Sequence, residues 1–485
     1  MSAETFDTNE TEDQAMFIGS SRRERAGRFR LLSAVLLCGV SVTSAQTPLP
    51  PLVIASNAQQ NQATQPSSTI LRLEDLEQMA ISTNPTLAQA EAAIRAAEGR
   101  RVQAGLLPNP VVGYAGEELA FRAIGEKSEH LAFIEQTIPL GGKLRKSRAI
   151  VTQEKLQTEQ VAAAQRQRIL NGVRMLFYRA LGAQQLVEVR TELAKLSRDA
   201  VKVTGELFNV GQADRPDVAQ IRIEAERAEL DLIMAENERE QVWVELASVV
   251  GNPALKPARL AGALEQGLPV LDQQALLTQM LTSSPEIKQA QTGVERARAV
   301  IARAKAEVMP DLFLRGGYGY NRELLEKEIP NAGRTGPEAQ VEIGVRIPLF
   351  NRNQGGIAAA TAELEIATRE VQRVELLLRA RFASAYRSYL NARRVASQYE
   401  KQIVPNAQSA YDMYLKNFRG MAAAYPQVLI AQRTLFQVRA DYIAALVNTW
   451  QNAVLLQGYL LNGALDAPAA MSSESDNSSN ADDRE

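Results

Sequence analysis

The sequence has almost none of the residues from which metal sites and nucleophilic pairs are built. Cys38 is the only cysteine and His130 the only histidine among 485 residues. Disulfide frameworks, zinc sites and Cys–His pairs each need several such side chains, so we expect none of them. We predict no catalytic residue, no metal ligand and no cofactor. The adjacent carboxylates Glu117 and Glu118 are more simply interpreted as solubilising a loop.

Net charge and aromatic side chains are also scarce. Lys and Arg total 54 against 56 Asp and Glu, a formal net charge of −2, and the two signs are interspersed. Proteins that bind nucleic acid carry a clustered basic excess, so we exclude nucleic acid as a partner. Phe, Trp and Tyr make up 5% of the residues, whereas Ala and Leu are common. This composition favours long helices over a bulky globular core.

Long apolar runs are missing after residue 45. No later run reaches the ~18 apolar residues of a membrane-spanning helix, so none is predicted. The basic segment 22–30 and the apolar, then small-residue segment 31–45 are typical of a secretory signal peptide. We predict a signal over residues 1–45, cleaved after Ala45. An ordinary buried helix is the alternative.

Two details of the signal stay open. The acidic stretch ahead of it leaves Met1 and Met16 as alternative starts. Cys38 is either removed with the signal or lipidated, and Leu37 stands where a lipoprotein signal has a small residue.

The chain repeats one pattern of turn signals after about 200–212 residues, an internal repeat of the kind that reveals duplication. Asn84-Pro85 and Ser284-Pro285 each place a capping side chain before a proline, as at a helix start. Each helix stops at Pro108 or Pro310. Both strand pairs that follow close with Ile-Pro-Leu, at 138–140 and 347–349. Each repeat thus predicts helix, strand, strand, long helix, turn and helix.

These signals divide the chain into predicted segments. They are a flexible linker at 46–69, a first repeat at 70–262 (strands about 110–138, coiled-coil hairpin about 143–250), a second repeat at 263–465 (strands about 311–348, coiled-coil hairpin about 354–461) and a disordered acidic tail at 466–485.

The predicted helix lengths indicate how the helices are arranged. The long helices, 143–207 and 354–417, are each ~96 Å long at 1.5 Å per residue. The return helices measure ~55 Å and the helices ahead of the strands ~36 Å. One return helix and one helix ahead of the strands, placed end to end, are therefore about as long as one long helix. Spacings of three and four favour coiled-coil packing, as in Leu186, Val189, Leu193, Leu196, Ala200, Val203 and Leu207.

The clearest strand lies at residues 340–347. Val341, Ile343, Val345 and Ile347 alternate with Gln340, Glu342, Gly344 and Arg346. In the strand before it, Arg315 falls opposite an apolar face. Strands of ~10 residues can span an outer membrane. We therefore predict the first set to face lipid and Arg315, Gln340, Glu342 and Arg346 to face a lumen. The first repeat alternates less well, because Phe133 and Gln136 break its pattern. A small sheet that caps a helical bundle is the alternative.

One chain supplies four predicted strands, which cannot close into a barrel. An open sheet edge cannot lie in lipid, so a membrane location requires several chains. Two chains would give eight strands with a filled interior, and three would give twelve with a pore. We expect a mainly α protein with a membrane β-barrel part, whose helices stand in the periplasm.

Three motifs add a resemblance to a known family. QAGLLPNP (103–110), PLGGK (139–143) and PLFNRNQGG (348–356) resemble the CzcC-type heavy-metal branch of the TolC-like outer-membrane efflux proteins. The resemblance covers about residues 70–465. It implies a homotrimer with a twelve-stranded β-barrel on a long α-helical periplasmic tunnel, in the outer membrane of a Gram-negative bacterium.

The resemblance also implies partners, substrates and an aperture. The partners are a periplasmic membrane-fusion adaptor and an inner-membrane proton-driven pump of the resistance-nodulation-division class. The substrates are cations such as cobalt, zinc, cadmium or nickel. The inner periplasmic tip falls at Asn417, Phe418, Arg419 and Gly420, and the outer tip at Gly211, Gln212, Ala213, Asp214 and Arg215.

Arg419 departs from the family pattern. Many family members carry acidic residues around the inner aperture, but this chain has no carboxylate between residues 413 and 428. An ordinary solvated turn residue is the alternative interpretation of Arg419.

Two other functions stay open at this point. One is export of drugs or other small molecules through the same kind of passive duct. The other is a periplasmic coiled-coil scaffold without a pore.

Overall fold

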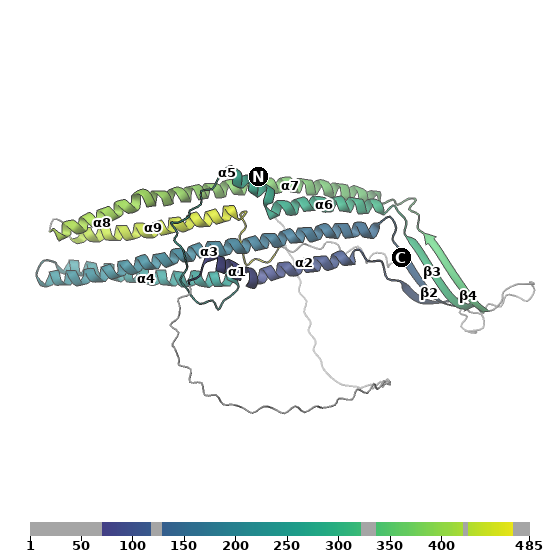
Figure 1. The fold of residues 1–485 in the computed structure, drawn as a ribbon, viewed down its shortest axis with the longest axis horizontal. Helices are drawn as coiled ribbons and strands as arrows, with labels where there is room; N and C mark the ends of the chain where they lie inside the picture. The colour runs from purple at the N-terminus through teal and green to yellow at the C-terminus, as the bar shows by residue number, and fades with distance from the viewer. Residues whose placement is uncertain (1–69, 118–128, 322–335, 421–424, 469–485) are drawn as a thin grey trace, which may run out of the picture. The chain divides into compact units, whose positions relative to one another are not determined.

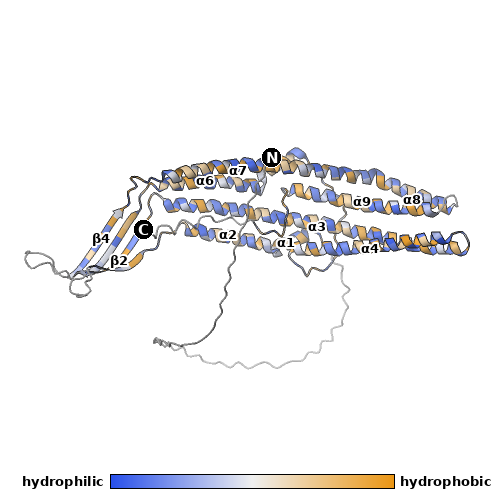
Figure 2. Cartoon of the chain, turned by 180° about the vertical axis from the view of Figure 1, so that it is seen from behind, coloured by the Kyte–Doolittle hydropathy of each residue, from blue (hydrophilic) through white to orange (hydrophobic). Residues whose placement is uncertain are grey.

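The computed structural model describes residues 70–117, 129–321, 336–420 and 425–468 (Figure 1). The predicted signal peptide with Cys38, the linker up to residue 69 and most of the acidic tail lie outside these ranges. All described residues belong to one compact unit. No helix within it is long and apolar enough to cross a membrane. Figure 2 shows hydrophilic and hydrophobic residues mixed along the long helices.

Both repeats contain the same elements in the same order. The first comprises α1 (Leu73–Thr83), α2 (Pro85–Gln103), β1 (Val111–Glu117), β2 (Glu129–Ile138), α3 (Lys143–Asn209) and α4 (Arg215–Val250). The second comprises α5 (Gln273–Ser283), α6 (Pro285–Ala306), β3 (Leu312–Asn321), β4 (Gly336–Val345), α7 (Gln354–Gln398), the π-helical turn η1 (Tyr399–Ile403), α8 (Val404–Arg419) and α9 (Tyr425–Gln457). The sequence did not predict α1 and α5, which occupy corresponding places.

The predicted helix starts are confirmed at both prolines. The Asn84 side chain accepts a hydrogen bond at 2.9 Å from the amide two residues on, and Pro85 begins α2. The Ser284 hydroxyl does the same at 3.3 Å, and Pro285 begins α6. A proline loses nothing in the first turn of a helix, where its missing N–H would have no partner.

Two shorter helices lie end to end beside each long helix, as the lengths predicted (Figure 1). Helices α2 and α4 pack on α3, while α6 packs on α7 and α9 packs on α7 and α8. Helix α3 also contacts α6 and α9, which joins the two repeats.

The second long helical stretch covers residues 354–419, close to the predicted 354–417, but it contains a π turn that the sequence did not predict. The Val404 amide donates to the carbonyl of Tyr399, five residues back, which makes the π turn. Pro405 follows at once. Proline lacks the N–H that an α-helix would direct at Lys401, and its ring crowds that carbonyl. A π turn is a common way to accommodate such a break.

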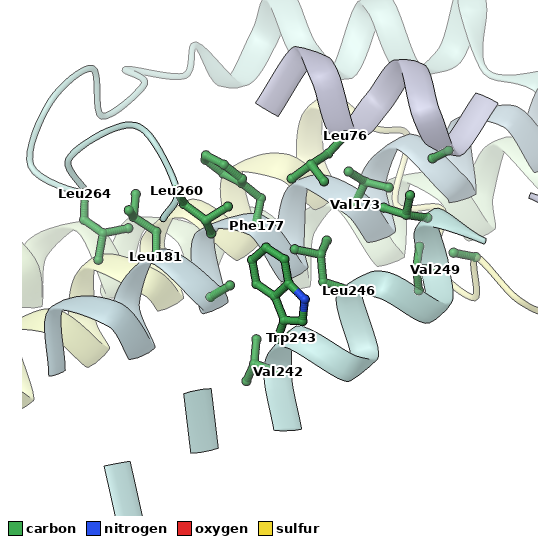
Figure 3. Packing of buried hydrophobic residues seen from close by; sticks show 14 of the residues in the cluster. Leu76, Val173, Phe177, Leu181, Val242, Trp243, Leu246, Val249, Leu260 and Leu264 are labelled. Atoms are coloured by element: carbon green, nitrogen blue, oxygen red, sulfur yellow. The ribbon is translucent and has the colours of Figure 1, made fainter. Parts of the chain in front are cut away.

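The largest core cluster lies where α1, α3 and α4 meet (Figure 3). It is built from Leu76 on α1, Val173, Phe177 and Leu181 on α3, and Val242, Trp243, Leu246 and Val249 on α4, with Leu260 and Leu264 from the segment that follows. The Trp243 indole donates at 2.8 Å to the Leu255 carbonyl, so this large ring is buried without losing a hydrogen bond.

The predicted heptad seam is confirmed over most of its length. Leu193, Ala200 and Ile221 are buried between the helices. Near the tip the prediction was wrong by one residue, because Thr204 is buried and Val203 is exposed. A straight α-helix drifts relative to a seven-residue repeat, which moves the buried stripe.

The four strands form one antiparallel sheet in the order β1-β2-β3-β4. Within each strand, successive side chains project from opposite faces, and directly opposite residues share a face. The register therefore assigns every strand residue to one of two faces. Strand β4 ends at Val345, two residues earlier than predicted, because the chain turns ahead of Leu349, whose amide donates to Ile347.

Candidate functional site

The Asp, Glu, Lys and Arg side chains of the four strands all lie on one face of the sheet. Glu135 of β2 and Glu342 of β4 are the Cα partners of Arg315 in β3, so the three form one row. The register assigns the remaining carboxylates to the same face. We call this surface the carboxylate face, and its acidic members are Glu117, Glu129, Glu135, Glu338 and Glu342.

Arg315 is held in the middle of its row by an aromatic ring. Its guanidinium carbon lies 4.0 Å from the centroid of the Phe133 ring, a cation–π contact. Its Nε atom is buried and has no hydrogen-bond partner within the described ranges. The Phe133 ring covers Gly113, where even a Cβ would collide with it. Phe133, which breaks the apolar pattern of its strand, therefore packs across the polar face and positions Arg315.

The opposite face is apolar and exposed. Of the predicted lipid-facing residues, Val341 is 76% exposed, Ile343 68%, Val345 50% and Ile347 64%. The register adds further exposed apolar side chains to this face, namely Val112, Tyr114, Ile134 and Tyr318. A continuous apolar surface of this kind marks contact with a membrane or another protein.

Two polar residues lie on the apolar face. The Gln136 amide donates at 2.9 Å to the carbonyl of Pro108, where the chain leaves the helices. At the opposite end of the strands, His130 hydrogen-bonds through Nδ1 to the Tyr114 hydroxyl. Because each sits near a strand end and has a hydrogen-bond partner, neither interrupts the middle of the apolar band.

The structure describes all four residues of the predicted inner tip. Asn417, Phe418 and Arg419 form the end of α8, and the Gly420 amide donates to the Lys416 carbonyl at 3.0 Å, capping the helix. The Phe418 ring lies 4.9 Å from that of Tyr425, the first residue of α9. Burial raises the pKa of Tyr425 to about 12, so this phenol stays neutral. This ring contact joins the end of α8 to the start of α9.

The predicted outer tip is a tight turn between α3 and α4. Gly211 has a φ of +75°, a conformation that suits glycine after a helix. Asp214 caps α4 and its amide donates at 3.1 Å to the Asp217 carboxylate. Arg215 is the first residue of α4 and is exposed. The Asp214 carboxylate is thus engaged in helix capping, whereas Arg215 faces solvent.

Sequence reasoning missed a buried charge where the two repeats meet below the sheet. Lys143, the first residue of α3, is 6% exposed. Its ammonium lies 2.8 Å from the Asp311 carboxylate and 3.0 Å from that of Glu307. Asp311 also accepts the Leu140 amide at 3.2 Å. PLGGK is a motif of the sequence, but its spacing gives no signal for partners more than 160 residues away.

The ion triad shifts two pKa values. Burial by itself would lower the pKa of Lys143, but its hydrogen bonds to Asp311 and Glu307 outweigh burial and raise it. Burial likewise opposes ionisation of Glu307, yet hydrogen bonds from Lys143 and Arg303 keep its pKa below the usual range. Lys143 and Glu307 are therefore both charged near neutral pH.

No group of three or more His, Cys, Asp or Glu side chains within the described ranges could hold a metal ion. The features in hand are a two-faced sheet, long paired helices and two tight tips. Such surfaces could line a passage for a solute. Comparison with known proteins shows in which family they occur.

A family model described as outer membrane efflux protein matches residues 76–252 and 276–460. The chain belongs to this family. Its matched halves coincide with the helix-strand-strand-helix pattern found in each repeat. The protein is therefore an outer-membrane efflux protein of a Gram-negative bacterium with a large periplasmic portion, and its family and fold are those of channels rather than enzymes.

Similar proteins agree with this assignment. The cobalt-zinc-cadmium resistance protein CzcC of Cupriavidus metallidurans is 27% identical over 396 residues, which cover 80% of this chain and 90% of the relative. Protein CyaE of Bordetella pertussis is 27% identical over 68% of this chain and 72% of its own length.

Solved structures share the fold at low sequence identity. The outer membrane protein VceC of Vibrio cholerae has a TM-score of 0.62 at 19% identity and covers 81% of this chain and 96% of its own. CusC has a TM-score of 0.62 at 18% identity, with 84% and 96% covered. The mainly α fold with a small antiparallel sheet and the resemblance to TolC-like channels are thereby confirmed.

Proposed function

We propose that the protein is the outer-membrane exit duct of a tripartite proton-driven efflux system and conducts heavy-metal cations of the cobalt, zinc, cadmium and nickel type. The observation that carries this proposal is its relation to CzcC, a cobalt-zinc-cadmium resistance protein, over nine-tenths of that relative's length. In this proposal the duct is passive and the pump drives transport. Substrate choice then rests largely with the pump.

The same proposal includes assembly as a homotrimer. The sheet of one chain has two edge strands, β1 and β4, each with a single neighbour among the described strands. The exposed apolar face of Val341, Ile343, Val345 and Ile347 suits contact with lipid. An open sheet edge cannot lie in lipid, so both edges then require partner chains. Three copies supply twelve strands, enough to close around a pore.

Closure gives each surface of the chain a role. The apolar face contacts outer-membrane lipid, and Arg315, Gln340, Glu342 and Arg346 line the lumen. The helices of the two repeats, residues 70–262 and 263–465, wrap into the periplasmic tunnel. Its aperture is built from the inner tip, Asn417 to Gly420, with Gly211, Asp214 and Arg215 outside it. A periplasmic membrane-fusion adaptor and a resistance-nodulation-division pump complete the path.

A growth assay tests the function. A strain that lacks the gene should become sensitive to one or more of cobalt, zinc, cadmium and nickel, and the intact gene should restore growth. A panel of drugs is scored in parallel. Drug sensitivity without metal sensitivity would transfer the protein to the export of other small molecules, which is the alternative substrate class.

A separate measurement tests the assembly. Protein extracted from the outer membrane in detergent should have the mass of three chains by light scattering. A monodisperse monomer that retains its strand content would contradict the barrel.

A further inference from the structure

The charges of the described surfaces are distributed unevenly between the sheet and the helix tip. The carboxylate face has five carboxylates, against Arg315 on the same face and Arg346 just beyond β4. For the described residues, that is a net charge of −3 per chain and −9 for three chains. The apolar face of the described strands holds no Asp, Glu, Lys or Arg. The described end of α8 carries the opposite sign, because Lys416 and Arg419 lie in its last turn.

We propose that the preference of this duct for cations is set by the carboxylate face inside the barrel, chiefly by Glu135 and Glu342, and not by the periplasmic aperture. This rests on the proposed trimeric channel. Rings of like charge select ions in pores because they raise the local concentration of counter-ions. Walls of low dielectric, such as a barrel in lipid, focus the field of these charges into the pore.

The packing around Arg315 supports the role of its row. Arg315 contributes the cation between Glu135 and Glu342, but its guanidinium is stacked on the Phe133 ring. The stack holds this positive charge against the wall of the sheet, where Gly113 leaves room for the ring. Two carboxylates thus flank one fixed cation in the register, so the row keeps a net negative charge that three copies repeat around the pore.

The second acidic pair lies at the far end of the strands. Glu117 and Glu129 are Cα partners across β1 and β2. The pair adds two further carboxylates to the carboxylate face, at the end of the strands away from the helices. Together with the row of Arg315 they extend one sign of charge along the path through the barrel.

The test is ion selectivity of the purified full-length protein in planar bilayers, measured as the reversal potential across a potassium chloride gradient. The native channel should prefer K⁺ over Cl⁻. The double variant Glu135→Gln with Glu342→Gln should lower the permeability ratio by about tenfold, the low end of the effect expected of a focused single-sign cleft. The matched control is Glu238→Gln, an exposed carboxylate on α4, which should keep the native ratio.

A second double variant and a measurement at high salt test the same inference. Glu117→Gln with Glu129→Gln should also lower the ratio and leaves Arg315 and its partners intact. The native preference should weaken at 1 M salt, where the Debye length falls to about 3 Å. A trimer on a gel confirms assembly of each variant.

Several outcomes would overturn the inference. They are an anion-selective native channel, an unchanged ratio in both acidic double variants, or a larger change in Arg419→Gln than in either. An unchanged ratio in the acidic variants, or a larger change in Arg419→Gln, leaves the proposed function standing, whereas an anion-selective native channel would count against both proposals. Absence of a channel from well-assembled trimers would remove both proposals.

Discussion

The two repeats differ most in their long helices. Helix α3 runs for 67 residues without a break, whereas the corresponding helix of the second repeat is divided by the π turn ahead of Pro405. Near its far end α3 buries Leu193, Ala194 and Ser197, while α8 contains no buried residue. Helices in corresponding places of the two repeats can therefore bury very different numbers of side chains.

Contacts between the repeats follow the same asymmetry. Helix α9 is buried against α3 through Leu435 and Phe436. Helix α8 is tied to this layer by polar contacts, in which Arg439 of α9 donates to Gln408 at 2.7 Å and pairs with Glu192 of α3 at 3.2 Å. A segment held by few buried apolar contacts opens at low free-energy cost. The end of the second repeat is thus the part best suited to move.

The largest expected effect is a loss of trimer assembly, which tests whether both strand pairs lie in lipid. The first pair is the less certain case from sequence, because its apolar and polar residues alternate less regularly. Arg on the lipid face near the midplane costs about 2–4 kcal/mol per copy, or about 6–12 kcal/mol for three additive copies. Ile343→Arg in β4 and Ile134→Arg in β2 should therefore both abolish the heat-modifiable trimer on a gel. Glu342→Arg, next to Ile343 on the other face, should assemble. Normal assembly of Ile134→Arg alone would restrict lipid contact to the second repeat.

The second effect concerns the ion triad, in which Lys143 at the start of the first repeat's long helix pairs with Glu307 and Asp311 of the second repeat. Lys143→Met leaves Glu307 and Asp311 without their buried partner and should cost about 3–5 kcal/mol, measured by urea unfolding in detergent.

Gln354→Met is the matched control, because Gln354 begins α7 as Lys143 begins α3 but is exposed. It removes two exposed hydrogen bonds, to the Arg352 amide and the Phe350 carbonyl, so its effect should stay within about 1.5 kcal/mol. Equal losses of stability in both variants would mean that the triad contributes no more than the exposed residue at the start of α7.

The triad also predicts a pH dependence. The pKa of Glu307 is lowered on folding, so its contribution is complete above the ordinary pKa of about 4.3 and is lost as the pH falls through the lowered value. The pKa of Lys143 is raised, so its contribution is complete below about 10.4 and is lost as the pH rises through the raised value. Lys143→Met should flatten the stability profile at both ends.

The third effect tests whether only the second repeat tolerates a break. Lys195 lies about as far along α3 as Pro405 lies along its own helix and is exposed. Lys195→Pro should cost about 3 kcal/mol or more, because α3 has no π turn to absorb it. Lys195→Ala is the control. Pro405→Ala should change stability by less than about 1 kcal/mol. If Lys195→Pro were as mild, α3 would be as adaptable as its counterpart.

The smallest effect compares the two proline-led helix starts. The Asn84 side chain caps α2 and also donates at 2.7 Å to the buried Val249 carbonyl, whereas Ser284 only caps α6. Asn84→Ala should cost about 2 kcal/mol and Ser284→Ala about 0.5–1 kcal/mol. Thermal unfolding of the two variants side by side measures the difference. The reverse order would show that the Val249 contact contributes little.

The sequence predicted features that depend on neighbours in the chain. The helix starts at Pro85 and Pro285 and the alternation of Val341, Ile343 and Val345 were read correctly, because caps and two-residue periodicity are local. The π turn was missed, although Pro405 gave a signal for it. A proline can kink, end or shift a helix, and the packing of α9 beside it decides which.

Features that depend on distant partners could not be predicted. The alternation of β4 separates Glu342 from Ile343 by sequence alone, but only the register across three strands sets Glu135 and Glu342 on either side of Arg315. Phe133 breaks the apolar alternation of its strand, and only the pairing of β1 with β2, which sets its ring over Gly113, explains why. Lys143 becomes a buried cation only when the second repeat brings Asp311 to it. Periodicity is fixed by backbone geometry within one segment, whereas register and burial follow from hydrogen bonds and packing between segments that the chain separates by up to two hundred residues.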